Sequence, residues 1–74
     1  MEHLFTTELP AGGQTRAFNV TFAEDWYVFT PPGGGSPVVR IRREEDEWHP
    51  EAGTDPGLAQ ACTDALERYL LSQH

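Results

Sequence analysis

The segment DPGLAQACTDALERYLLSQH (Asp55–His74) decides the fold, because its apolar residues recur with the period of a helix. Steps of three and four residues place these side chains in one stripe along a helix. The stripe comprises Leu58, Cys62, Ala65, Leu66, Tyr69 and Leu70. Asp55 is a residue type that caps helices, and Pro56 suits the first helical position, where its missing N–H costs nothing. We therefore predict a helix over about 56–73, whose apolar stripe needs a partner surface.

The residues before this helix read as short strands that can supply that surface. Apolar and polar residues alternate over 3–9, 14–22 and 38–43, while 26–30 is dense in aromatic and β-branched residues. Short connections make neighbouring strands pair antiparallel. The sequence therefore predicts the α+β class, with a three- or four-stranded antiparallel sheet and one C-terminal helix packed on one face, in the order ββββα.

The connections between the predicted strands also have a clear signature. Residues 31–37 read PPGGGSP, a composition that neither a helix nor a central strand tolerates, so we predict a flexible loop there. Residues 44–53 are charged, and we expect them to be irregular. All strands then fall within 3–47 of a single small domain that spans residues 1–74.

Size and cysteine content limit what such a domain can do. A chain of 74 residues builds a thin two-layer core and no deep cavity of the kind that small-molecule enzymes use. The single cysteine excludes an internal disulfide, so self-association as a homodimer is the remaining source of extra stability. One cysteine and no signal peptide point to the cytoplasm, and no apolar stretch is long enough for a membrane span.

The charge of the chain disfavours nucleic acid as a partner. The formal net charge is −7, and all five basic residues are arginine. Binding to phosphate needs local positive charge, which this balance does not favour. The acidity has two open interpretations: adaptation to high salt, or a binding role.

The segment RIRREEDEWHPE, residues 40–51, and the aromatic strand before it supply the candidate interaction surface. Three arginines precede four consecutive acids and then a Trp-His pair, so a tryptophan anchor would stand beside bidentate arginine donors. The alternative is a solvated strand end with Trp48 at the edge of the core. Trp26 and Val28 join the surface if the helix covers only one sheet face; otherwise the sheet curls and the N-terminal strand covers Trp26. The candidate residues are Trp26, Val28, Arg40, Arg42, Arg43, Glu44, Glu45, Asp46, Glu47, Trp48 and His49.

Catalytic, cofactor and metal sites are not indicated by any pattern in the chain. Cys62 lies on the apolar stripe, where a cysteine acts as a small hydrophobe, and the acids near it discourage ionisation. The acids around His49 lack the spacing of zinc or calcium sites. The glycine loop enters a strand and has no lysine, unlike a phosphate-binding loop. We therefore expect no enzymatic activity and no cofactor.

Two short pieces resemble HicB-type antitoxins: the aromatic strand of residues 25–31, which ends in proline, and the Glu67–Leu70 end of the helix. The segment that links them is long and acidic, and we expect no DNA-binding part after the helix. We carry no function over from this resemblance.

The function that we expect is binding. The first hypothesis is a small cytoplasmic interaction or regulatory module with an unidentified protein partner. The second is an acidic mimic of nucleic acid that inhibits a basic protein, using residues 44–47 together with Glu24, Asp25 and Glu51. The third is a small metal-dependent enzyme that uses His49 and nearby acids.

Overall fold

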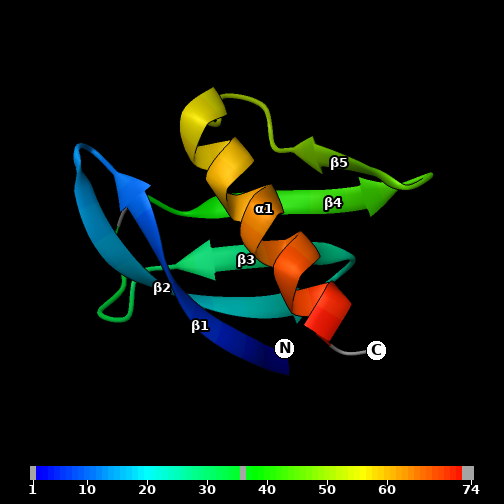
Figure 1. Cartoon of the computed structure of the whole chain (residues 1–74), viewed down its shortest axis with the longest axis horizontal. Coiled ribbons are helices and arrows are strands. Elements are labelled where there is room, and N and C mark those ends of the chain that lie inside the picture. Colours follow the sequence, from blue (N-terminus) through cyan, green and yellow to red (C-terminus); the bar gives the residue numbers. More distant parts are fainter. Residues whose placement is uncertain (1, 36, 73–74) are drawn as a thin grey trace.

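Five antiparallel strands form one sheet, and the C-terminal helix lies across one face of it (Figure 1). The computed structural model describes residues 2–35 and 37–72. The strands lie in the sheet in the order in which they occur in the chain. Their bounds are β1 Glu2–Ala11, β2 Gln14–Ala23, β3 Trp26–Thr30, β4 Val39–Glu44 and β5 Glu47–Pro50, and the helix α1 is Pro56–Ser72. The α+β class and the antiparallel sheet with one C-terminal helix are confirmed.

The prediction of three or four strands is wrong by one strand. β5 pairs antiparallel with β4 in a segment that we expected to be irregular, so the strands extend from 2 to 50 rather than over 3–47. Glu45 and Asp46 form the turn between them, with φ angles of 52° and 65°. Positive φ at both central residues defines the type I′ hairpin turn, which glycine, asparagine or aspartate usually supplies. A run of four acids therefore conceals this turn in the sequence.

Two other hairpins use the same kind of turn. Gly12 and Gly13 join β1 to β2 with φ angles of 61° and 79°. Glu24 and Asp25 join β2 to β3 with φ angles of 53° and 69°. The twist of such turns matches that of the strands that they connect, which fixes the register of each pair.

The helix begins where the capping residues predict. The Leu58 N–H donates to Asp55 Oδ2 at 2.9 Å, and the Ala59 N–H donates to Asp55 O at 2.8 Å. Pro56 is the first helical residue. The helix ends at Ser72, so the part of the prediction that covers residue 73 lies outside the described residues. Within the described chain, this helix is neither long nor apolar enough to cross a bilayer.

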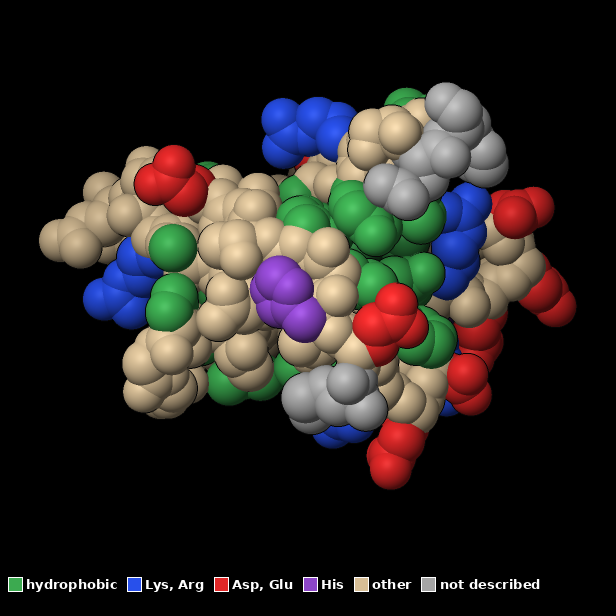
Figure 2. Space-filling model, turned by 90° about the horizontal axis from the view of Figure 1, so that it is seen from below, with side chains coloured by type: hydrophobic (Ala, Val, Ile, Leu, Met, Phe, Trp, Pro, Cys, Tyr) green, Lys and Arg blue, Asp and Glu red, His purple; other side chains and the backbone are tan. Residues whose placement is uncertain are grey.

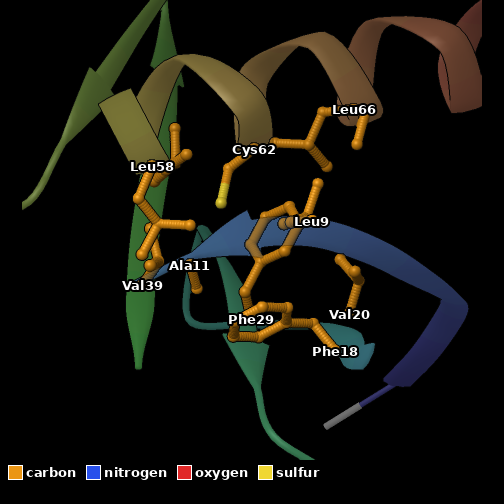
Figure 3. Close-up of a cluster of buried hydrophobic side chains, with 11 residues drawn as sticks. Leu9, Ala11, Phe18, Val20, Phe29, Val39, Leu58, Cys62 and Leu66 are labelled. Atoms are coloured by element: carbon orange, nitrogen blue, oxygen red, sulfur yellow. The ribbon is translucent and has the colours of Figure 1, made fainter. Parts of the chain in front are cut away.

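The core lies between α1 and the sheet. Figure 3 shows Leu58, Cys62 and Leu66 on the helix side of this cluster and Phe18, Val20 and Phe29 on the strands. Burying a large apolar side chain of this kind stabilises the fold by about 1.5–3 kcal/mol. The core cluster consists of Leu9, Ala11, Phe18, Val20, Phe29, Val39, Ile41, Leu58, Cys62, Ala65 and Leu66.

The connection from β3 to β4 contains a turn in which the Gly34 N–H donates to Pro31 O at 2.9 Å. Gly34 and Gly35 have φ angles of 82° and 86°, which glycine adopts without strain. The flexibility predicted for 31–37 stays a prediction, and Ser36 lies outside the described residues.

Candidate functional site

Side-chain alternation divides the predicted surface residues between two faces and a turn. We call the sheet face opposite α1 the open face. It carries Trp26, Val28, Arg40, Arg42, Glu44, Glu47 and His49. Glu45 and Asp46 form the β4–β5 turn, whereas Arg43 and Trp48 lie opposite each other on the helix side. The structure therefore brings most of the predicted surface together and separates two residues from it.

Trp26, Arg40 and Arg42 pack together on the open face, and we call them the Arg–Trp–Arg cluster. β3 pairs with β4 so that Val28 lies opposite Arg40, which brings both arginines beside Trp26. Their guanidinium carbons lie 4.9 and 5.0 Å from the centre of the Trp26 ring. A cation at such a distance is attracted by the face of the ring. Trp26 is half-buried, and the side chains over its ring come from β4.

Each arginine of β4 also meets a carboxylate. The pairs are Arg40–Glu51 at 3.0 Å, Arg42–Glu44 at 2.7 Å and Arg43–Asp46 at 3.8 Å, measured from nitrogen to oxygen. All six side chains are more than a third exposed, so water and salt screen these pairs. Exposed ion pairs contribute about 0–1 kcal/mol. The acids therefore orient the arginines without holding them strongly.

Arg42 has hydrogen-bonding capacity that the described chain does not use. Its Nε is buried and has no hydrogen-bond partner among the described residues. A buried donor without an acceptor costs about 1–3 kcal/mol. The described residues therefore leave one donor of the Arg–Trp–Arg cluster without an acceptor.

Acidic residues gather at one end of the sheet. The connections between successive antiparallel strands alternate between the two ends of the sheet. The β2–β3 turn, Glu24-Asp25, and the β4–β5 turn, Glu45-Asp46, therefore lie at the same end. Figure 2 shows acidic side chains collected at this end, on the right of the view. β4 continues to Glu44, past the level at which Ile41 lies opposite Tyr27, so the Glu45-Asp46 turn projects further from the sheet than the Glu24-Asp25 turn. The structure thus places two acidic pairs that are distant in the sequence at the same end of the sheet.

Trp48 belongs to an aromatic group on the helix side. Its ring meets the Tyr27 ring edge-on with the centroids 5.7 Å apart, and it packs against the core. Arg43 also lies over the Trp48 ring, with its guanidinium carbon 4.7 Å from the ring centre. Tyr27 in turn contacts Phe22 with the centroids 5.0 Å apart. This placement corresponds to the alternative interpretation of Trp48, at the edge of the core.

Cys62 is fully buried in the core and faces the sheet (Figure 3). Burial raises the pKa of its thiol from 9.0 to about 12. The thiolate is the reactive form of cysteine, so this side chain is a poor nucleophile at neutral pH.

Metal binding finds no support in the geometry. No group of three or more histidine, cysteine, aspartate or glutamate side chains could hold a metal ion within residues 2–35 and 37–72. His49 approaches one acid, with Nε2 at 3.8 Å from Glu47 Oε2.

The surface residues predicted from the sequence leave out Glu51, which was assigned there only to the acidic mimic. Glu51 lies beside β5 and pairs with Arg40, and its N–H donates to Arg40 O at 2.9 Å. The alternation of Glu47, His49 and Glu51 with Trp48 and Pro50 is the signal that could have revealed it.

Comparison with protein-family models, with curated proteins and with solved structures finds no match to this chain.

Proposed function

We propose that this chain is a non-catalytic interaction module that binds a protein partner through the open face of its sheet. The observation that carries the proposal is the Arg–Trp–Arg cluster, in which two guanidinium groups lie about 5 Å from one tryptophan ring on the face that the helix leaves uncovered. Tryptophan and arginine are among the residues that supply most of the binding energy in protein interfaces.

The ion pairs of the cluster suit exchange with a partner. Arg40 and Arg42 each hold an acid of their own chain through an exposed, screened contact. A partner carboxylate or backbone carbonyl replaces such a contact at little cost. An acceptor on the partner that draws Arg42 away from Trp26 would also accept a hydrogen bond from the buried Nε of Arg42. The same movement would free the Trp26 ring for apolar contact.

The setting that we propose is the cytoplasm. The chain has one cysteine, which is a free, buried thiol, and this usage is typical of a reducing compartment.

Affinity capture from the native lysate tests the proposal with three variants. Trp26→Ala and Arg42→Glu change the open face, while Arg68→Glu makes the same charge change on an exposed position of α1. Wild type and Arg68→Glu should retain a common partner that both open-face variants lose, with all four chains folded by circular dichroism. Equal capture by all variants would contradict the assignment of this surface.

The acidic end of the sheet favours a second candidate, the mimic of nucleic acid. Glu24-Asp25 and Glu45-Asp46 form two acidic turns at the same end of the sheet, and Glu44 and Glu47 flank the second one. A mimic binds its basic target by charge pairing, so the affinity falls steeply as salt rises. Glu45→Gln with Asp46→Asn removes two charges and keeps side chains of the same size and shape. Capture that survives both high salt and this double variant would exclude the mimic.

A further inference from the structure

The two outer strands of the sheet differ in how much free edge they offer. β1 has ten residues and β5 has four. A two-residue turn makes the residues on either side of it a hydrogen-bonded pair, as at Ala11↔Gln14 in the first hairpin. Such pairs alternate with pairs whose N–H and C=O groups face away from the neighbouring strand. The residues of β1 whose backbone groups face outward are therefore Thr6, Glu8 and Pro10.

The same alternation applies to β5. Its first hydrogen-bonded pair is Glu44↔Glu47, beside the turn, so the backbone groups of Trp48 and Pro50 face outward. The bond from the Glu51 N–H to Arg40 O, at 2.9 Å, agrees with this alternation.

Proline stands at an outward-facing position on both edges, where its missing N–H removes no bond within the sheet. Proline there also hinders pairing with a further strand. Within β5, Pro50 leaves Trp48 as the single outward N–H, whereas β1 keeps the N–H and C=O groups of Thr6 and Glu8. The β1 edge is thus the one that can accept another strand.

We propose that β1 pairs antiparallel with β1 of a second copy of this chain, about a two-fold axis at Thr7, and joins two five-stranded sheets into one. The regular part of β1 lies between the bulge at His3/Phe5 and Pro10. In this register Phe5 of one copy lies beside Leu9 of the other, and Thr7 lies beside its own symmetry mate. Leu9 is already buried in its own chain, at 2% exposure, so the new contacts come from the Thr7–Thr7 pair and from the backbone.

The backbone of this register is also self-complementary. The outward groups of Thr6 in one copy meet those of Glu8 in the other, and the reverse holds across the axis. Moving the axis by one residue towards Glu8 would place the two Glu8 carboxylates directly opposite each other, which is unfavourable. Moving it towards Thr6 would bring the bulge into the ladder. One strand therefore provides both halves of a closed two-fold interface, which favours a second copy over an unrelated strand.

The charge of the chain gives this interface its own salt dependence. Each copy carries a formal net charge of −7, so repulsion opposes pairing at low ionic strength. Added salt screens this repulsion and should strengthen the dimer.

Sedimentation equilibrium of wild type, Glu8→Pro and Glu8→Ala tests the pairing. The apparent mass of the wild-type protein should rise with concentration from the 8.3 kDa of one chain to twice that value. Glu8→Pro removes the N–H that bonds to Thr6 of the other copy at two symmetric places, so the dissociation constant should rise roughly hundredfold. Glu8→Ala keeps the N–H and should dimerise at least as well as wild type. A wild-type chain that stays monomeric, or a dimer that folded Glu8→Pro forms equally well, would overturn the proposal.

Amide hydrogen exchange of wild type keeps the test decisive if Glu8→Pro fails to fold. The Thr6 and Glu8 amides should become protected as the concentration rises, while the outward Trp48 amide on β5 serves as the internal control. Fast exchange of Thr6 and Glu8 at concentrations where the dimer predominates would overturn the pairing through β1.

Discussion

The two faces of the sheet come from the same strands and differ in what their side chains accomplish. On the helix side, Phe18, Val20, Phe29 and Ile41 are 0% exposed. On the open face, Trp26 is half-buried beneath charged side chains. Strand alternation thus lets one segment stabilise the fold with one set of residues and present the proposed binding surface with the next. Substitutions at neighbouring positions should therefore have very different effects.

The largest expected effect is on the helix side of β3. Phe29→Ala removes a fully buried ring and should lower the free energy of unfolding by about 3–5 kcal/mol. Val28→Ala, one residue away on the open face, is the matched control and should lower it by less than about 1 kcal/mol. Urea denaturation measures both values, and equal losses would contradict the division between the faces.

Alkaline pH should weaken the core through Cys62. Its pKa is about 12 in the folded chain and 9.0 when unperturbed. Between these values the unfolded chain has released a proton that the folded chain still holds, so the free energy of unfolding falls as pH rises. This contribution is fully present below pH 9.0 and is lost progressively towards pH 12. Urea denaturation at increasing pH should show that the free energy of unfolding falls more steeply for wild type than for Cys62→Ala. Equal falls in the two proteins would contradict this role of Cys62.

A smaller effect is expected at the start of α1. Asp55→Ala removes the oxygen that accepts the Leu58 N–H at 2.9 Å and should cost about 1 kcal/mol of stability. Glu67→Ala, at an exposed position of the same helix, is the control and should change stability by less than about 0.5 kcal/mol. Thermal unfolding distinguishes the two, and an unchanged midpoint for Asp55→Ala would show that the cap does not stabilise the helix.

The smallest effect is expected from the ion pairs of the open face. Removing both Arg40 and Glu51 in a double-mutant cycle should give a coupling energy below about 1 kcal/mol, because both side chains are well exposed. A larger coupling energy would mean that ion pairs on the open face also stabilise the fold, which would contradict the division of roles between the two faces.

The sequence predicts the helix side better than the open face. The stripe from Leu58 to Leu66 and the alternation in β2 identify the core, because burial leaves a periodic pattern of apolar residues. The cap at Asp55 follows from residue preference at helix starts. These features depend on local sequence, which is why they could be predicted.

The remaining features depend on how segments meet in space. β5 was missed because its turn lies within a run of four acids and places Glu45, a residue type that rarely adopts positive φ, at the first central position. The stacking of Arg40 and Arg42 on Trp26 depends on the register between β3 and β4, which no local pattern specifies. Trp48 was predicted on the same surface as Arg42. His49 lies opposite Arg42 on the open face, and Trp48, the residue next to His49, therefore points to the helix side.

The most direct test of the open face as the binding surface is photo-crosslinking in the native lysate. A photoreactive amino acid at His49 stands on the open face, and the same group at Glu67 stands on the exposed side of α1. Binding through the open face predicts a crosslinked partner from position 49 and none from position 67. A partner captured from position 67 alone would contradict it.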